Sequence, residues 1–508
     1  MKRADVAVAL LLFVASLALY VRTLAPSLLY GDSEEFQTIA YTLGIGHPTG
    51  YPVYVLLAKA FTLIPVGDVA YRVNLFSAFC AALTIGFVYL STRKLGAMAL
   101  TAIYGSLALA LTPLFWKHAS IAEIYAPSAA CLAFILFAVL HWKETHNPRW
   151  LFVAGLLGGL SLGIHTTVAL GGISILVYLA LSNCHRAEWL QALLGAIVGT
   201  LIFLSSFFFL DTLNSPAGYY NTVVYPSLSV WDMTPTDFDS LFERLAFLYF
   251  PPQFKGQLFN VRFEEAVTRW KDFASSVSGN LLLALLGFIS LLVPRKDESS
   301  RWREAILLIL AFITFLVFAA TYNVYDYYVY YIPADVILAV FIGLGVNGVV
   351  ELFASNPKLP RFTPISLSIA LLVLGFFPFI GVVSSHWNKR IPAGLDDWEE
   401  YFYSFPGSRR LEAEEIVNQL EDNAIVFTDW DYAYSYYYVA HVLQGRTGMS
   451  FHETLPQEGV ARFADSAITY IEANIDSHPI YFSERPSQLA NKFKIAVAGS
   501  GLFRIVRK

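Results

Sequence analysis

The sequence predicts an α-helical polytopic membrane protein with a small α/β domain outside the membrane. Of its 508 residues, 56% are hydrophobic and only 14% are charged, whereas soluble domains are about a quarter charged. The mean hydropathy is +0.54. Long apolar segments recur to about residue 385, and beyond that point the apolar runs shorten and charged residues become denser. The net charge of −5 and the absence of a long basic run argue against nucleic-acid binding.

Eleven segments are apolar enough to be membrane spans, because a helix needs about 20 apolar residues to cross the hydrocarbon core. The fifth and eighth are short and are read as re-entrant or differently tilted. The candidate spans are residues 6–24, 69–91, 97–115, 122–142, 149–164, 166–182, 189–210, 280–294, 304–321, 332–353 and 363–384.

Basic residues alternate between successive loops, which sets the expected orientation because short cytoplasmic loops are rich in Lys and Arg. The short outer loops hold almost none, with Lys117 as the exception. We therefore expect an integral protein of the cell (plasma) membrane with a cytoplasmic N-terminus, an uncleaved first span and an extracytoplasmic C-terminal domain. The inner loops hold Lys2, Arg3, Arg93, Lys94, Lys143, Arg149, Arg186, Arg295, Lys296, Arg301, Arg303, Lys358 and Arg361.

Two domains are expected, a multispanning core over residues 1–385 and an α/β domain over 386–508. The core carries long outer loops at 25–68 and 211–279. In the tail, EAEEIVNQLEDN and YAYSYYYVAHVLQG read as helices around a buried strand at AIVFTDW. PIYFS and FKIAVAGSGLFRIVRK read as later strands, the last pair forming a hairpin. Alternation of helices and strands predicts an α/β arrangement.

The stretch GDSEEFQTIAYTLG places three acids just after the first span and reads as a short helix. In one interpretation Asp32 is the N-cap, and Glu35 completes a variant of the capping box. In the other, Asp32 and Glu35 share a helix face because they are three residues apart. A partly desolvated carboxylate has a raised pKa and is a better proton acceptor. The two interpretations are compatible.

The following GHPTGYP segment is a turn rich in proline and glycine, which would hold His47 and Tyr51 in place. A structural role is a rigid re-entry into the membrane. A functional role is that His47 bonds an oxygen of a phosphate or a sugar.

Further polar residues lie at the predicted outer ends of other spans. Each has a structural interpretation. Glu123 would interact favourably with the dipole of the helix it precedes, the tyrosines would form an aromatic belt at the membrane interface, and Arg72 would extend its charged end to the membrane surface. An arginine there also suits a lipid phosphate. Their convergence predicts a polar pocket at one membrane face, which suits an enzyme with a lipid-borne donor and an aqueous acceptor. These residues are Arg72, Asn74, Glu123, Tyr125, His165 and the YNVYDYYVYYIPAD loop.

Six motifs in this order resemble one family: GDSEEF, HPTGYP, RVNLFSA, AEIYA, LGIHTT and DNAIVFTDWDYAYSYYY. The chain resembles a bacterial relative of the membrane glycosyltransferase family that includes the vertebrate O-mannosyltransferase of plexin-type receptors. The resemblance covers the membrane part well and the tail moderately. It implies a GT-C type fold and transfer of a sugar, mannose, from a polyprenyl-phosphate donor to a protein or glycan hydroxyl.

The resemblance also implies residue roles. Asp32 would be the catalytic base and Glu35 would support it or bind substrate. The donor site would be lined by His47, Glu123, Tyr125 and His165. The family pattern has glycine where this chain has Glu34, and the vertebrate tail is longer, so the acceptor stays open.

Direct displacement at the anomeric carbon would invert configuration if no covalent intermediate forms, and a lipid phosphate needs no acid to leave. Asp32, Glu35 and Glu123 would offer hard oxygen ligands to a divalent cation, Mg or Mn, although the spacing does not decide whether one binds. A competing class is a transporter or flippase of a lipid-linked sugar, which predicts internal repeats and polar residues at mid-membrane. The sequence has no such repeat. A non-catalytic membrane scaffold leaves the three acids explained only as caps.

Overall fold

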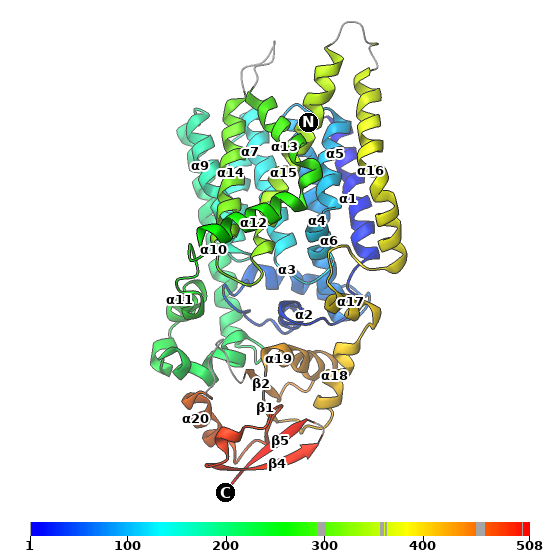
Figure 1. Ribbon diagram of the computed structural model, residues 1–508. Coiled ribbons are helices and arrows are strands. Elements are labelled where there is room, and N and C mark those ends of the chain that lie inside the picture. The colour runs from blue at the N-terminus through cyan, green and yellow to red at the C-terminus, as the bar shows by residue number, and fades with distance from the viewer. Residues whose placement is uncertain (1, 293–300, 356–359, 361–362, 454–462, 500) are drawn as a thin grey trace. The chain divides into compact units, whose positions relative to one another are not determined.

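The computed structural model describes residues 2–292, 301–355, 360, 363–453, 463–499 and 501–508 (Figure 1). Four of the expected inner-loop basic residues, Arg295, Lys296, Lys358 and Arg361, lie outside the described residues. The chain packs into two compact units. Unit 1 comprises residues 1–24, 77–203 and 256–395, and unit 2 comprises 25–76, 204–255 and 396–508.

Unit 1 is a bundle of helices, to which the long helices α4 and α10 each contribute one part (Figure 1). Its elements are α1 (Arg3–Arg22), α4 (Val69–Lys94), α5 (Ala99–Ala110), α6 (Pro113–His118), α7 (Tyr125–Thr145), α8 (Arg149–Ser161), η1 (Thr166–Leu170), α9 (Gly171–Leu181), α10 (Arg186–Leu213), α12 (Phe263–Ser276), α13 (Ser278–Leu292), α14 (Trp302–Thr321), η6 (Tyr327–Tyr331), α15 (Ile332–Ala354) and α16 (Thr363–Lys389).

In the described part of the chain, nine of the predicted spans each overlap a single helix, whereas residues 97–115 are divided between α5 and α6 and residues 166–182 between η1 and α9. Residues 293 and 294 of the eighth span lie outside the described residues. Six helices are long and apolar enough to cross a membrane, and up to eight are if two bent pairs each count as one span. Helices α5, α8 and α9 are shorter apolar helices. The prediction of a polytopic helical membrane protein is confirmed.

Helix α15 lies at the centre of unit 1 and packs against α5, α13, α14 and α16. Small residues allow the close approach, as in other membrane helix pairs. A Cβ on Gly105 of α5 would lie 2.3 Å from the Ala339 carbonyl oxygen, and one on Gly345 would lie 1.7 Å from that of Leu283. Larger side chains at these two glycines would force the helices apart.

Unit 2 combines loops from the first half of the chain with the tail. Besides the remaining parts of α4 and α10, its elements are α2 (Asp32–Thr42), α3 (Pro52–Thr62), η2 (Tyr220–Val224), η3 (Tyr225–Trp231), η4 (Pro235–Phe238), α11 (Leu241–Tyr249), η5 (Pro252–Phe254), α17 (Asp397–Ser404), α18 (Ser408–Val417), β1 (Ile425–Thr428), α19 (Trp430–Tyr437), η7 (Tyr438–Leu443), β2 (Ser450–Glu453), α20 (Asp465–Asn474), β3 (Ile480–Phe482), η8 (Ser487–Leu489), β4 (Phe493–Gly499) and β5 (Leu502–Arg507).

The tail forms one mixed sheet with strand order β2-β1-β3-β5-β4. Strand β1 lies between β2 and β3, runs parallel to both, and has all four residues buried. Its alternate side chains enter two different apolar clusters, because successive residues of a strand face opposite sides. The expected α/β arrangement and the β4–β5 hairpin are confirmed, whereas β2 has no counterpart among the predicted strands.

Residues 25–76 and 204–255 belong to the same compact unit as the tail. Helix α19 contacts both α2 and strand β2 (Figure 1). A hydrogen bond from Thr38 Oγ1 to the Tyr434 carbonyl oxygen, 3.1 Å long, ties α2 to α19. The division at residue 385 stays a prediction.

Candidate active site

The first turn of α2 holds the three acids. Gly31 occupies the N-cap position with φ +62° and ψ −143°, a conformation that favours glycine. Asp32 is therefore the first helical residue, and no side-chain cap is present at this helix start. The prediction that Asp32 caps the helix is wrong, because Gly31 takes that position. Asp32 and Glu35 are left to face His47, in the segment that follows the helix.

Glu35 and His47 form the closest contact of the site. The buried Glu35 accepts a hydrogen bond from the His47 backbone N–H through Oε1, at 2.8 Å, and its Oε2 contacts the ring Nδ1. Gly50 closes the turn with φ +83°, and a Cβ there would lie 2.6 Å from the Leu248 side chain. The turn in the HPTGYP motif thus holds His47 against α2.

The other ring nitrogen of His47 faces Asp32. Nε2 lies 3.8 Å from Asp32 Oδ2 and 3.1 Å from the Tyr51 hydroxyl, which donates to the Pro48 carbonyl at 2.8 Å. The imidazole is therefore placed between two carboxylates that share a helix face, as their spacing predicted.

The two carboxylates differ in access to solvent. The Asp32 side chain is 43% exposed and that of Glu35 is 0% exposed. Desolvation raises the pKa of Asp32, the attraction of His47 opposes this, and repulsion from Glu35 and Asp431 adds to it. Asp32 is therefore the carboxylate that is accessible to solvent, and Glu35 is the buried carboxylate that contacts His47.

Glu34, the residue that departs from the family pattern, pairs with the tail. Its carboxylate lies 3.1 Å from Arg409 Nε and 3.4 Å from Nη2, and both side chains are buried. The guanidinium carbon lies 4.5 Å from the centre of the Tyr432 ring. Burial raises the pKa of Glu34 to about 8, against the opposing attraction of Arg409. The extra acid is thus partnered by a residue of α18.

More acids gather where the parallel strands of the sheet end, and sequence reasoning missed them. Asp429 follows β1, and Glu453 ends β2 beside it in register with Thr428. Burial, with repulsion from Asp429 and Asp431, raises the pKa of Glu453 to about 8. Ligands commonly bind at the carboxyl ends of parallel strands. The TDWD motif at the end of a predicted strand could therefore have identified these acids as candidate site residues.

Trp430, between the two aspartates of that motif, extends the site with an aromatic wall. Its ring lies edge-on to His47, with centres 6.1 Å apart, and 6.0 Å from the Tyr219 ring. Aromatic rings pack against the apolar faces of ligands. The wall supplies such a surface beside the imidazole.

Arg72 and Asn74 lie in unit 2, and the side chains of both donate hydrogen bonds to backbone carbonyl groups. The Arg72 guanidinium donates to the carbonyls of Thr62, Val66 and Gly67 at 2.9, 2.9 and 3.0 Å. Asn74 donates to the Ala25 carbonyl at 3.0 Å and accepts from Gln37 of α2 at 2.9 Å. Their contacts position the loop and α2. A role in substrate binding stays a prediction.

The remaining predicted residues belong to unit 1. Tyr125, at the start of α7, lies with its ring centre 5.9 Å from that of His165 and 5.0 Å from that of His118. Tyr330 of the tyrosine-rich loop lies 5.7 Å from His165. Burial, with repulsion from Lys117, lowers the pKa of His118 to about 3, so this imidazole is neutral. We call His118, Tyr125, His165 and Tyr330 the ring cluster.

Glu123 is buried just before α7. Its backbone is paired with the Ser77 hydroxyl, at 3.3 Å from the carbonyl oxygen and 3.4 Å from the nitrogen. The Tyr125 hydroxyl is 3.4 Å from Asp326 Oδ2, which brings the tyrosine-rich loop to the same place. Glu123, Tyr125 and His165 thus form a group within unit 1.

Asp32, Glu35 and His47 are suited to hold a cation, because one ligand atom from each lies within 4.8 Å of the others. Two carboxylates and an imidazole are ligands that a divalent ion such as Mn accepts. His47 was not in the ligand set expected from the sequence, which named Asp32, Glu35 and Glu123; a role for Glu123 stays a prediction. Both oxygens of Glu35 contact His47. Binding of an ion by Glu35 would therefore replace one of these two contacts.

Part of the chain matches a known protein family. Residues 32–189 match the family model of the protein O-mannosyl-transferase TMEM260 N-terminal domain. All nine predicted site residues fall within that segment. The chain is 29% identical over 153 residues to protein O-mannosyl-transferase TMEM260 of Mus musculus and 25% identical over 140 residues to that of Dictyostelium discoideum. These matches cover 30% and 27% of the chain and only 22% and 17% of the relatives.

Solved structures share the fold over nearly the whole chain. ArnT from Cupriavidus metallidurans, crystallised with undecaprenyl phosphate, superposes with a TM-score of 0.60 at 14% identity, covering 98% of this chain and 97% of ArnT. The Archaeoglobus fulgidus oligosaccharyltransferase gives a TM-score of 0.51 at 13% identity, covering 93% of this chain and 69% of that one. The chain therefore has the GT-C type fold of these membrane enzymes.

Proposed function

We propose that this protein is a glycosyltransferase that moves mannose from a polyprenyl-phosphate donor to a hydroxyl group. The acceptor is a Ser or Thr of a protein, or a glycan or lipid, at the outer face of the cell membrane. The GT-C type fold, the match to an O-mannosyltransferase domain and the undecaprenyl phosphate bound by ArnT support the reaction class. The observation that carries the proposal is the half-exposed Asp32 facing an imidazole that Glu35 holds.

In this reaction Asp32 takes the proton of the acceptor hydroxyl as its oxygen attacks the anomeric carbon. The bond between that carbon and the phosphate oxygen breaks, and its electron pair leaves with the lipid phosphate. A raised pKa makes Asp32 a better proton acceptor while it is ionised. One displacement inverts the configuration at the sugar carbon, and the phosphate leaves without a general acid.

His47 serves as a positioning residue in this scheme. Glu35 fixes the ring from the Nδ1 side, and Nε2 faces Asp32 at 3.8 Å. The electrostatic attraction of the ring for Asp32 would orient that carboxylate. If Asp32, Glu35 and His47 hold a divalent cation, that ion would supply positive charge for the phosphate.

The ring cluster and Glu123 are proposed to bind the donor. A neutral His118 can donate one hydrogen bond to a phosphate or sugar oxygen, and the tyrosine rings offer faces for the sugar. The cytoplasmic N-terminus and outer tail expected from the charges of the loops complete the proposal.

The test is sugar transfer by purified full-length protein from radiolabelled polyprenyl-phosphate mannose to an acceptor mixture. We expect Asp32→Asn to lower the rate by about 10²–10⁴-fold, as removal of a general base does. Asp397→Asn is the matched control, because Asp397 is likewise the first residue of a unit 2 helix and is exposed. Near-normal transfer by a folded Asp32→Asn variant would exclude Asp32 as the base.

The same protein in vesicles distinguishes the flippase alternative. A flippase would move intact donor lipid across the bilayer without releasing polyprenyl phosphate. Mass spectrometry of surface proteins and glycolipids with and without the gene would identify the acceptor by a lost hexose.

A further inference from the structure

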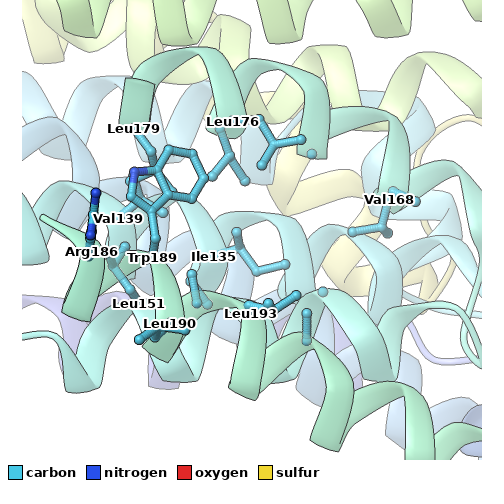
Figure 2. A pocket seen from close by; sticks show the side chains of 18 residues that line it. Ile135, Val139, Leu151, Val168, Leu176, Leu179, Arg186, Trp189, Leu190 and Leu193 are labelled. Atoms are coloured by element: carbon cyan, nitrogen blue, oxygen red, sulfur yellow. The ribbon is translucent and has the colours of Figure 1, made fainter. Parts of the chain in front are cut away.

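Unit 1 contains an apolar cavity whose lining residues have no role in the proposed reaction. Its volume is about 720 Å³, and its walls come from α7, α8, α9 and α10 (Figure 2). Side chains such as Ile135, Leu176 and Leu193 line it, and Arg186 lies beside Trp189 at one end while Val168 lies at the other. We call this cavity the apolar groove.

Small residues keep the groove open. A Cβ on Gly155 would lie 2.1 Å from the Ala192 carbonyl oxygen, so α8 and α10 meet backbone to backbone. Gly158 and Gly172 line the groove itself, and a Cβ on either would meet no atom within 4 Å. Ordinary leucines at these two positions would fill space that the sequence leaves empty.

The size and chemistry of the groove suit a hydrocarbon chain. Its volume falls within the roughly 300–1,000 Å³ that small-molecule sites occupy. Apart from Arg186, the residues around it are aliphatic, glycine or tryptophan. A sugar or peptide would leave its polar groups unpaired against such walls.

Arg186 adds a positive charge at one end. The nearby acid, Glu188, is already engaged, since it accepts hydrogen bonds from Trp142 Nε1 at 2.7 Å and from the His185 N–H at 2.8 Å. Arg186 is exposed. A guanidinium binds a phosphate through two parallel hydrogen bonds, and tryptophan is favoured at the level of lipid headgroups.

The charged end of the groove lies far from the ring cluster. Tyr125 is the first residue of α7, whereas Val139, which lines the groove beside Arg186 (Figure 2), is in its second half. A helix of 21 residues is about 31 Å long at about 1.5 Å per residue, close to the thickness of a bilayer core. A lipid with its phosphate on Arg186 therefore belongs to the leaflet opposite the ring cluster.

We propose that the apolar groove binds one anionic phospholipid of that leaflet, with its phosphate on Arg186 and an acyl chain along α7–α10. This lipid is distinct from the proposed sugar donor. Its contacts would brace α8, α9 and α10 within the bundle.

The test is native mass spectrometry of the full-length protein, delipidated in detergent and offered phosphatidylglycerol, phosphatidylcholine or a polyprenyl phosphate. We expect one phosphatidylglycerol to bind in preference to phosphatidylcholine. Arg186→Gln should weaken phosphatidylglycerol binding about fivefold, as expected for one basic residue near a lipid surface. Arg149→Gln, which removes an exposed cation outside the groove, is the matched control and should leave binding unchanged.

A second variant tests the groove without touching the charge. Gly158→Leu should weaken binding of both phospholipids, because its side chain fills the space of the acyl chain. Equal phosphatidylglycerol binding by wild type, Arg186→Gln and Gly158→Leu would overturn the proposal. Displacement of phosphatidylglycerol by equimolar polyprenyl phosphate would also overturn it, since the groove would then belong to the donor.

Discussion

The ion pair between Glu34 and Arg409 decides how firmly the tail supports the acidic helix. Above a pH of about 8, where the Glu34 carboxyl is ionised, the two charges, 3.1 Å apart, attract by about 5 kcal/mol at an effective dielectric constant of about 20, before the opposing desolvation is counted. Replacing Arg409 by Met leaves the Glu34 carboxyl buried without its partner. Breaking a buried ion pair in this way costs about 3–5 kcal/mol, so we expect Arg409→Met to lower the free energy of unfolding by that amount above a pH of about 8, where Glu34 is ionised.

Removing both charges should be far less harmful than removing one. The double variant Glu34→Gln, Arg409→Met leaves no uncompensated charge, and buried pairs replaced by uncharged side chains are often neutral. We therefore expect the double variant to recover most of the loss, with a coupling free energy of up to about 3 kcal/mol in the double-mutant cycle.

The pH dependence follows from the sign of the Glu34 shift. Its pKa is about 8 in the folded protein, against an ordinary value of 4.5, so the folded state binds this proton more tightly than the unfolded chain does. The resulting stability is complete below pH 4.5 and is lost as pH rises through about 8. Wild type should therefore lose stability relative to Glu34→Gln across that window.

Thermal unfolding of the full-length protein in detergent, followed by tryptophan fluorescence, measures both effects. Arg410→Met is the matched control, because Arg410 follows Arg409 on α18 and its partner Glu414 lies at 3.5 Å with both side chains partly exposed. Such a surface pair is worth only about 0.2–1 kcal/mol. Equal losses from Arg409→Met and Arg410→Met, or no pH-dependent difference from Glu34→Gln, would refute the reasoning.

Three further predictions concern the proposed reaction. Because the pKa of Asp32 is raised, kcat/KM should fall on acidification at a pH above the ordinary value of 3.8. Asp431→Asn removes a charge that repels Asp32, so it should move this fall to a lower pH. A pH profile that Asp431→Asn leaves unmoved would contradict the assignment of Asp32 as the base. Glu35→Gln should lower kcat about tenfold through the loss of one charged hydrogen bond to His47, with a smaller change in KM, as steady-state kinetics would show. If Asp32, Glu35 and His47 hold a cation, EDTA should reduce the rate of sugar transfer and Mn²⁺ should restore it. His47→Ala should then raise the Mn²⁺ concentration that is needed. A transfer rate that EDTA does not change would rule out a cation requirement.

The membrane class and the positions of the apolar helices were readable from the sequence because hydrophobic length is a local property of the chain. The helix at Asp32 and the shared face of Asp32 and Glu35 were readable for the same reason, since helix spacing places them. The prediction that Asp32 is the N-cap was wrong, because the preceding residue, Gly31, adopts a positive φ and occupies the N-cap position.

Contacts between distant segments depended on the tertiary structure. Glu34 and Arg409 are 375 residues apart, and no local pattern pairs a departure in one motif with an arginine in the tail. Parallel pairing of β1 and β2 brings Asp429 and Glu453 to one edge, which depends on strand order. The group of three possible cation ligands was likewise decided by folding, because the turn after α2 brings His47 back to Asp32 and Glu35.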